Sequence, residues 1–354
     1  YLIVPEIKND SALPAFDKVI IYHHTYKHNY FYKSPVEDAR KFYEKISLKY
    51  KIDVIHAHNL FTAFIASKVV RKLDLGFIYD DHETWSLWLK LRAKAGVGLN
   101  KFLRWYAYLR SIGIEKSIAK QADGIIVTNT KCIDFYKRLK IPEEKIISVE
   151  NIALQEEIDE ALRHEDLVVE FFNKDKRKKL VHVYHPHQTG KQGKKDDIIN
   201  RQFDTFIEAQ EQLEDWVLVL FGKKDPELEK RGVRFIDFLP RIAYLANIAK
   251  ADVGINPLVL TEKTALSSQN RVFEYAKLGV RIISTKTPLL EENFGEKVIW
   301  FNPDEPVEKL VTILKNIEDY PTGKELQNYS KKFSWEEEMK KLVKMYERIL
   351  KENR

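Results

Sequence analysis

Short apolar runs, rich in β-branched and aromatic residues, alternate along nearly the whole chain with longer segments in which apolar residues recur every three or four positions. Because the short runs are largely apolar on both faces, they are typical of strands in a parallel sheet that helices cover on each side. We expect strands at residues 1–5, Val19–Tyr22, Ile52–His56, Phe77–Tyr79, Ile125–Thr128, Ile146–Val149, Leu180–Tyr184, Val217–Phe221, Val233–Phe235, Val253–Ile255, Arg281–Ser284 and Val298–Phe301.

The longer segments predict helices, which include Phe61–Leu73, Lys131–Leu139, Ile198–Leu213, Ile242–Ala249, Asn270–Leu278 and Ser334–Glu352. The alternation breaks at 155–179, a stretch rich in charged residues. We therefore expect an α/β protein with two Rossmann-like domains, 1–155 and 180–333, joined by a connection at 156–179. The chain opens with Tyr1 rather than Met, and we expect its natural start to lie upstream.

Composition narrows the class of protein. Of the 354 residues, 44% are hydrophobic and 32% are charged, which suits a folded chain with substantial cores. No apolar run approaches the roughly 18 residues of a membrane-spanning helix, and a single cysteine excludes a disulfide framework and favours the cytoplasm. The net charge of +6 weakly favours an anionic partner, and because no nucleic-acid recognition motif is present, we expect none of that kind.

The segment Ser267–Ile283 carries the clearest chemistry. Ser268 and Asn270 are good residues for a helix start, and Arg271 and Glu274, three positions apart, share one face of the helix. Free amides at a helix start, together with an arginine, suit a diphosphate, and the glutamate suits the hydroxyls of a ribose. An ordinary surface ion pair between the two side chains explains the same spacing. No P-loop and no GxGxxG motif is present.

Two further groups of polar residues follow expected strands. His56 and His58 lie at positions i and i+2, so both point to one side if the strand continues through them. Three interpretations of these histidines are open: they contact a ligand, they are held in place at a strand end, or they belong to a metal-dependent hydrolase barrel. The two-domain pattern disfavours the barrel. Asp81, His82 and Glu83 follow the next strand and form either an acceptor-binding loop or the polar start of a helix.

Residues 85–110 alternate aromatic and basic side chains. Helices of this kind suit an anionic membrane surface. The alternative is that the aromatic side chains pack on the sheet while the basic side chains face water.

Several stretches, in this order, resemble retaining glycosyltransferases of family 4. They are Asp53–Asn59 (Asp-Val-Ile-His-Ala-His-Asn), Tyr79–Glu83 (Tyr-Asp-Asp-His-Glu), Ala119–Thr128, Ile146–Asn151, Ser267–Ile283 and Phe333–Trp335 (Phe-Ser-Trp). The resemblance implies the GT-B fold, in which two Rossmann-like domains with parallel sheets face each other across a cleft. It also implies that the last helix, within 334–354, returns to the N-terminal domain.

The chain departs from this family at two points. The family commonly has two glutamates separated by seven residues, but Leu266 stands where the first belongs, and Glu262 is out of register. The family's Gly-Arg-x-x-x-x-Lys-Gly stretch is absent after the first strand of the second domain, where this chain has Tyr184–Gly193. Lys191 or a nearby histidine is the replacement that we expect for the missing cations.

The resemblance implies transfer of a sugar from a nucleotide-diphosphate sugar to a glycan or lipid-linked acceptor, with retention of the anomeric configuration. In the donor site, Arg271, Asn270, Ser268 and Lys191 would hold the phosphates and Glu274 the ribose. His58 would be the catalytic residue that positions the sugar, and His56, Asp81, His82 and Glu83 would lie on the acceptor side.

No metal or other cofactor is expected. We expect the protein to be located in the cytoplasm, with peripheral attachment to the inner face of the cell membrane through residues 85–110. A nucleotide-sugar epimerase or hydrolase on the same fold, or a non-catalytic nucleotide-sugar-binding subunit, remain the alternatives.

Overall fold

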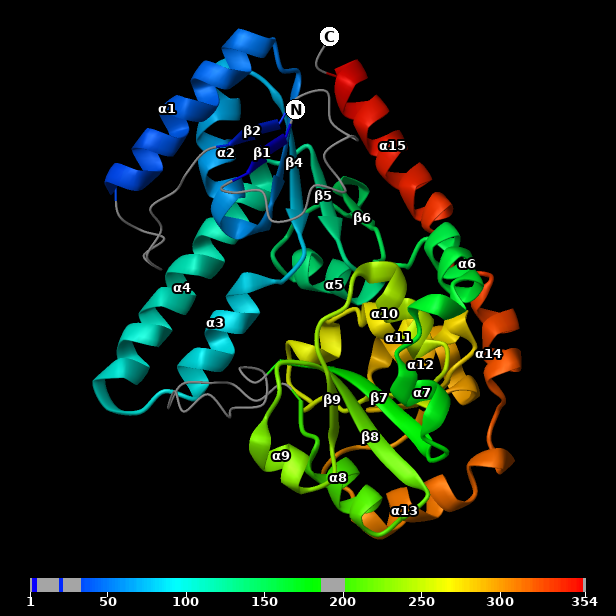
Figure 1. The fold of residues 1–354 in the computed structure, drawn as a ribbon. Helices are drawn as coiled ribbons and strands as arrows, with labels where there is room; N and C mark the ends of the chain where they lie inside the picture. Colours follow the sequence, from blue (N-terminus) through cyan, green and yellow to red (C-terminus); the bar gives the residue numbers. More distant parts are fainter. Residues whose placement is uncertain (1, 5–18, 22–32, 186–200, 353–354) are drawn as a thin grey trace.

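The computed structural model describes residues 2–4, 19–21, 33–185 and 201–352. They form two lobes, each built on a parallel sheet (Figure 1). In the N-lobe, four strands lie in the order β3-β4-β5-β6, and β1 and β2 form a separate parallel pair. Their bounds are β1 Leu2–Val4, β2 Val19–Ile21, β3 Val54–His58, β4 Gly76–Asp81, β5 Gly124–Val127 and β6 Ile146–Ser148.

Helices surround the four-stranded sheet of the N-lobe. They are α1 Lys33–Tyr50, α2 Asn59–Leu73, α3 Trp85–Lys94, α4 Gly98–Gln121 and α5 Thr130–Arg138. Every residue of β4 and β5 is buried, as expected for central strands with helices on both faces. The main core of this lobe joins Phe77 and Tyr79 of β4 to side chains of α2, α4 and α5.

The C-lobe contains six parallel strands in the order β12-β11-β10-β7-β8-β9. Their bounds are β7 Lys178–Tyr184, β8 Trp216–Gly222, β9 Arg234–Ile236, β10 Val253–Asn256, β11 Arg281–Ser284 and β12 Ile299–Trp300. The helices between and after them are α8 Asp204–Glu211, α9 Pro226–Lys230, α10 Arg241–Ile248, α11 Asn270–Leu278, α12 Pro288–Phe294, α13 Val307–Lys315 and α14 Gly323–Ser330. The predicted α/β fold with parallel sheets is confirmed.

The expected connection at 156–179 contains folded structure. It holds most of α6 (Gln155–Arg163), a short 3-10 turn and α7 (Glu170–Lys174). Ile158, Ala161 and Phe172 are buried in the same core cluster as Val217 and Val219 of β8. Most of its charged residues lie on the exposed faces of these short helices, while Ile158, Ala161 and Phe172 pack on the C-lobe.

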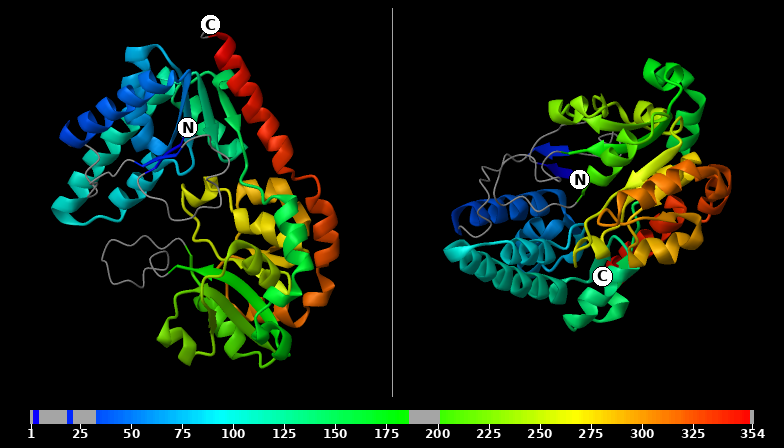
Figure 2. Two further views of the ribbon diagram at one scale, coloured as in Figure 1. Left: turned by 45° about the horizontal axis from the view of Figure 1, so that its top comes forward. Right: turned by 90° about the horizontal axis from the view of Figure 1, so that it is seen from below.

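The last helix, α15 (Trp335–Glu352), returns to the N-lobe. The first view of Figure 2 shows α14 and α15 following one another along one side, from the lower lobe to the upper one. Met345 and Ile349 are buried against Ile78 of β4 and Ile126 of β5. The contact is close at Gly124, where an added Cβ would lie 2.4 Å from Met345 Sδ.

Some predicted boundaries shift. Residues 198–200 of the helix predicted at Ile198–Leu213 lie outside the described residues. Its described part is helical at Asp204–Glu211, because Arg201 instead pairs with Leu258 in an isolated β-bridge and Phe203 is buried ahead of the first turn. Among the described residues, no helix is both long enough and apolar enough to cross a membrane.

Candidate functional site

Residues 262–266 bring the C-lobe into contact with the N-lobe. Asn129 Nδ2 donates a hydrogen bond to Leu266 O (2.7 Å), and Cys132 Sγ contacts the same oxygen at 3.3 Å. Leu266 stands five positions before Arg271, so the start of α11 lies close to the boundary between the lobes.

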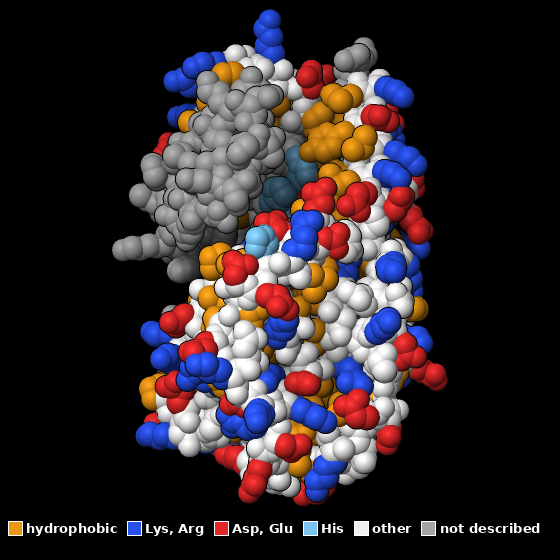
Figure 3. All heavy atoms as spheres, turned by 45° about the vertical axis from the view of Figure 1, so that its right-hand side comes forward, with side chains coloured by type: hydrophobic (Ala, Val, Ile, Leu, Met, Phe, Trp, Pro, Cys, Tyr) orange, Lys and Arg blue, Asp and Glu red, His pale blue; other side chains and the backbone are white. Residues whose placement is uncertain are grey.

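Charged side chains complete this contact. Glu262 lies between Lys90 and Lys94 of α3, at 2.6 and 2.8 Å, and Lys263 pairs with Glu83 at 3.0 Å. Acidic and basic side chains also lie around the junction of the two lobes on the face that Figure 3 shows. Because solvent-exposed pairs contribute at most about 1 kcal/mol each and weaken with salt, this contact is compatible with movement of the lobes.

Arg271, in the first turn of α11, is held by a fully buried histidine of β7. His182 Nδ1 lies 2.5 Å from Ile255 O, so its N–H donates to that carbonyl and its Nε2 is left to accept from the Arg271 guanidinium. Burial, and then the charge of Arg271, hold the pKa of His182 well below its usual range. The neutral imidazole therefore fixes the guanidinium without cancelling its charge.

A second buried cation lies beside Arg271. Arg201 precedes α8, and burial, followed by the charge of Arg271, lowers its pKa to about 9. Its guanidinium donates to Gln269 Oε1 at 3.4 Å, directly before α11. The sequence analysis did not identify Arg201, because its neighbours Gln269 and Arg271 lie far away along the chain.

The other predicted donor-site residues occupy different surroundings. Asn270 is exposed at the first position of α11, and Ser268 Oγ is buried with no hydrogen-bond partner among the described residues. The residue before the helix, Gln269, makes no side-chain cap, so the first amides of α11 donate no hydrogen bond to its side chain. Glu274 Oε1 accepts from Arg241 at 2.5 Å. Lys191 lies outside the described residues.

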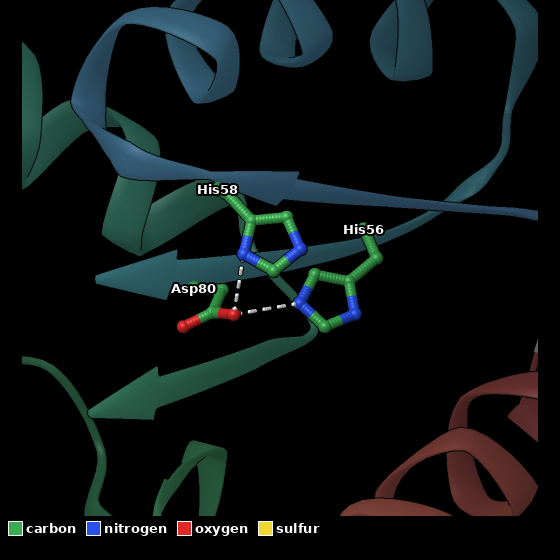
Figure 4. A group of neighbouring side chains, drawn as sticks. All are labelled: His56, His58 and Asp80. Atoms are coloured by element: carbon green, nitrogen blue, oxygen red, sulfur yellow. Dashed lines mark hydrogen bonds and ion pairs between the residues drawn. The ribbon is translucent and has the colours of Figure 1, made fainter. Parts of the chain in front are cut away.

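A cluster of imidazoles lies at the carboxyl ends of β3 and β4. Asp80 Oδ2 is 2.8 Å from His58 Nδ1, 3.1 Å from His56 Nε2 and 3.0 Å from His82 Nε2. The register of the sheet causes this, because His58 of β3 stands beside Asp80 of β4. Figure 4 shows both strand-β3 imidazoles directed at the one carboxylate.

The electrostatics of the cluster centre on this carboxylate. Burial opposes ionisation of Asp80, but hydrogen bonds from His56, His58 and His82 hold its pKa well below the usual range. The hydrogen bond to Asp80 in turn raises the pKa of His82. The cluster therefore keeps Asp80 ionised and favours a proton on His82. Asp80 was not singled out in the sequence, although the repeated spacing of His56-x-His58 and Asp80-x-His82 was visible there.

Asp81 does not face the cleft as predicted. It is buried, where Oδ2 accepts from Tyr136 Oη (2.8 Å) and Oδ1 accepts from the Thr84 amide (2.9 Å). Successive residues of a strand point to opposite faces, so Asp80 and Asp81 cannot both join the histidines. Glu83 is exposed and pairs with Lys263 across the lobe boundary.

A buried glutamate of α4 lies near Asp81. Glu115 Oε1 accepts from Tyr79 Oη at 3.3 Å, and its Oε2 has no partner among the described residues. Burial, and then the charge of Asp81, raise the pKa of Glu115 to about 8. Since Asp81 has two donors, we assign the negative charge to Asp81 and the proton to Glu115.

Comparison with known proteins agrees with the architecture. Residues 5–152 match the sequence family described as Glycosyltransferase Family 4. No curated protein sequence matches the chain significantly.

Solved structures resemble the whole chain. Sucrose-phosphate synthase from Thermosynechococcus elongatus aligns over 94% of this chain and 83% of its own, with a TM-score of 0.67 and 16% identity. Anabaena HepE in complex with UDP and glucose aligns over 93% and 86%, with a TM-score of 0.61 and 11% identity. UDP-GlcNAc 2-epimerase from Neisseria meningitidis, bound to UDP-GlcNAc, aligns over 92% and 84%, with a TM-score of 0.58 and 10% identity.

At these identities the structural likeness establishes the fold alone. Residues 5–152 match glycosyltransferase family 4, and the chain has the two-lobed α/β fold of GT-B glycosyltransferases.

Proposed function

We propose that this protein transfers a sugar from a nucleotide-diphosphate sugar to a glycan or lipid-linked acceptor, with retention of configuration at the anomeric carbon. The observation that carries the proposal is the pair of cations at the start of α11. Burial and the charge of Arg271 lower the pKa of the neighbouring Arg201 guanidinium. Gln269 contacts Arg201 and the neutral His182 contacts Arg271, and neither contact adds negative charge. Such a site attracts an anion.

The diphosphate is the part of the donor that needs this charge. Breaking the bond from the anomeric carbon to the diphosphate leaves positive charge on the sugar and negative charge on the leaving group. Fixed cations and helix amides stabilise that leaving group, because they need no reorganisation during the reaction. In this proposal, Arg271, Arg201, Ser268 and Asn270 bind the diphosphate, and their charge makes a metal at this position unnecessary.

On the N-lobe, His58 is the residue proposed to position the sugar. Its side chain is 59% exposed while its Nδ1 is held by Asp80, so the outer edge of the ring is free to meet a ligand from a fixed direction. His56 supports the same arrangement through Tyr346 Oη, 2.6 Å from its Nδ1. His82 and Glu83 lie on the acceptor side. We assign no general base.

For Glu274, the ribose role remains a proposal that competes with an ion pair. Its carboxylate is 10% exposed and contacts Arg241, which also contacts Glu157 at 3.1 Å. A carboxylate has capacity for further hydrogen bonds beyond one arginine contact. Glu274 could therefore accept ribose hydroxyls with Arg241 still in place.

The proposed reaction is tested with purified protein and a panel of UDP-, GDP-, ADP- and dTDP-sugars, with and without a mixture of lipid-linked and free glycan acceptors. The proposal is supported if the nucleoside diphosphate is released only when an acceptor is present. It also requires that the product's anomeric proton, observed by NMR, has the same configuration as in the donor. Inversion of that configuration, or the absence of nucleotide binding in calorimetry, would refute it.

An epimerase or hydrolase is the second candidate, because the neisserial 2-epimerase has the same fold and the Asp80–His82 pair provides an acid and a base beside the proposed sugar position. The same experiment separates the two. An epimerase interconverts the nucleotide-sugar without acceptor, and a hydrolase consumes it without acceptor, whereas a transferase requires the acceptor.

We further propose that α3 and α4 dock on an anionic membrane, which places the protein at the inner face of the cell membrane. Apolar side chains of α4 and the preceding loop face solvent, notably Val97 (83% exposed), Leu99 (77%) and Phe102 (72%). Lys94 and Lys101 lie among them and are exposed. Apolar insertion together with basic side chains is the combination that binds anionic lipid.

Vesicle sedimentation tests this docking. Vesicles of phosphatidylcholine with phosphatidylglycerol should bind the protein, and those of phosphatidylcholine alone should bind it less. Leu99→Asp should abolish the difference, while Leu48→Asp, at a similarly exposed leucine of α1 (66%), should not. Equal binding by both variants would refute the assignment of α4.

A further inference from the structure

Three histidines contact the same oxygen of Asp80. The contacting atoms are His58 Nδ1, His82 Nε2 and His56 Nε2, at 2.8, 3.0 and 3.1 Å from Oδ2. The rings lie almost parallel, with 16° between His56 and His58 and 20° between His58 and His82. Because all three contacts go to Oδ2, the nitrogen atoms converge on one carboxylate oxygen and are not divided between the two.

As a result, the two oxygens of the Asp80 carboxylate differ in the number of hydrogen bonds that they accept. Each carboxylate oxygen has about two lone-pair directions, so three N–H donors crowd Oδ2. The other oxygen, Asp80 Oδ1, is buried with no hydrogen-bond partner among the described residues. A hydrogen-bond network built only to hold the histidines would share them between both oxygens. A positive ion among the ring nitrogens and Oδ2 would resolve the crowding.

The donor set fits a divalent transition metal. His56, His58 and Asp80 offer ligand atoms that lie within 4.8 Å of one another. Zn²⁺ binds imidazole nitrogen and carboxylate oxygen at about 2.0–2.2 Å in tetrahedral geometry, which separates ligand atoms by roughly 3.3 Å. The observed contacts of 2.8 and 3.1 Å to Asp80 need only small ring movements to open to that spacing. Mg²⁺ and Ca²⁺ prefer all-oxygen ligands and fit poorly.

The surroundings of the cluster also fit a metal site. Metal-binding histidines commonly use the second ring nitrogen to contact a fixed partner, and His56 Nδ1 lies 2.6 Å from Tyr346 Oη of α15. His58 is 59% exposed and His82 is 38% exposed, so an ion has a path from solvent. His82 lies in place to become a fourth ligand.

We propose that His56, His58 and Asp80 form a reversible binding site for a divalent transition-metal ion, Zn²⁺ above all, with His82 as a further ligand. Metal binding replaces the imidazole protons that now face Asp80 Oδ2 and fixes His58 on the ion. The consequence for activity rests on the proposed function: His58 would be withdrawn from the sugar, and Zn²⁺ would inhibit transfer. The binding itself does not depend on that function.

Titration calorimetry of the full chain, stripped of metal with EDTA and dialysed, tests the site directly. Wild-type protein should bind at least one equivalent of Zn²⁺, and should not bind Mg²⁺ there. His58→Ala should lose one equivalent, and because His58 is exposed, this variant should keep its fold by circular dichroism. Tyr346→Phe should keep the site but weaken its affinity, by about 10-fold.

A matched control is available at His164, an exposed histidine of the C-lobe whose Nδ1 lies 3.2 Å from Asp166 Oδ1. Among the described residues, this pair belongs to no group of three possible metal ligands. His164→Ala should bind as the wild type does. Co²⁺ serves as a second probe, since a tetrahedral site of nitrogen and oxygen ligands gives visible absorption bands, which His58→Ala should lose.

Absence of Zn²⁺ binding, or a stoichiometry that His58→Ala leaves unchanged, would overturn the metal site. The transfer assay gives a separate result. If one equivalent of Zn²⁺ binds through His58 and transfer continues at full rate, the metal site stands and the proposed role of His58 at the sugar fails.

Discussion

The buried carboxyl of Glu115 predicts that the N-lobe loses stability as the pH rises. Its pKa is about 8 in the folded protein, against 4.5 for an exposed glutamate. Between those values the folded lobe keeps a proton that the unfolded chain has released. The contribution to stability is therefore complete below pH 4.5, declines through the interval and is lost above pH 8.

The size of the effect follows from the same two pKa values. The free energy of unfolding should fall by about 1.4 kcal/mol for each pH unit in the interval, or roughly 3 to 5 kcal/mol in total. Glu115→Gln removes the ionisation while keeping the shape of the neutral acid. The variant should match the wild type near pH 5 and exceed it in stability by a few kcal/mol near pH 8.5.

Hydrogen exchange of peptides from β4 and β5 is a suitable assay, because it reports opening of the N-lobe even if the lobes unfold separately. Glu150, whose burial raises its pKa to about 7, contributes in the same direction to the wild type and to the variant, so its contribution cancels in their difference. That difference reports Glu115 together with its interaction with the neighbouring Asp81. Glu165→Gln is the control, since Lys250 lowers the pKa of that exposed carboxyl. Equal pH dependence of the wild type and Glu115→Gln would refute the assignment of the proton.

Three further predictions concern the donor site and the return of α15. Arg271→Ala should lower kcat at least about 100-fold, as loss of one preorganised donor to a developing anion does; steady-state kinetics with the identified donor measures it. Glu274→Gln should weaken binding of the nucleoside diphosphate in calorimetry by roughly 1–3 kcal/mol, if the carboxylate accepts ribose hydroxyls. Gly124→Val should destabilise the N-lobe by about 1–3 kcal/mol in hydrogen exchange, because its side chain would meet Met345 Sδ, only 2.4 Å from the nearest added atom.

Each of these has its own contrary result. Near wild-type turnover by Arg271→Ala would remove that residue from the diphosphate site. Unchanged nucleotide affinity in Glu274→Gln would leave the carboxylate with a purely structural partner in Arg241. For Gly124, Met345→Ala in the valine variant should restore part of the lost stability, and failure to do so would mean that the strain lies elsewhere.

Much of the fold could be predicted from the sequence, because buried parallel strands leave a strong signal. All of Trp216–Gly222 is buried in β8, and the run reads as apolar throughout. In α4 the pattern fails for a physical reason. Leu99 and Phe102 face solvent, so the apolar positions do not mark the buried face of that helix.

The residues of the candidate site were harder to predict from the sequence than the fold. Asp80 and Asp81 are adjacent and identical in type, and only the pleat of β4 determines which one meets the histidines. Arg201 gains its position from the bridge with Leu258 and from Gln269, both distant in sequence. His56, His58 and Arg271 could be singled out from the sequence as candidates, because strand ends and helix starts are where side chains reach a cleft.

The position of α15 affects the order in which the protein can fold during synthesis. Its 18 residues are made after the strands of both sheets, yet Met345 and Ile349 cover Ile78 and Ile126 of the first lobe. Until the ribosome has produced them, one face of that sheet lacks its cover, while the second lobe has already received all its strands. The N-lobe is therefore completed only after the C-lobe, although its strands are synthesised first. A chain that terminates before α15 would expose the apolar surface of the N-lobe sheet and be prone to aggregation.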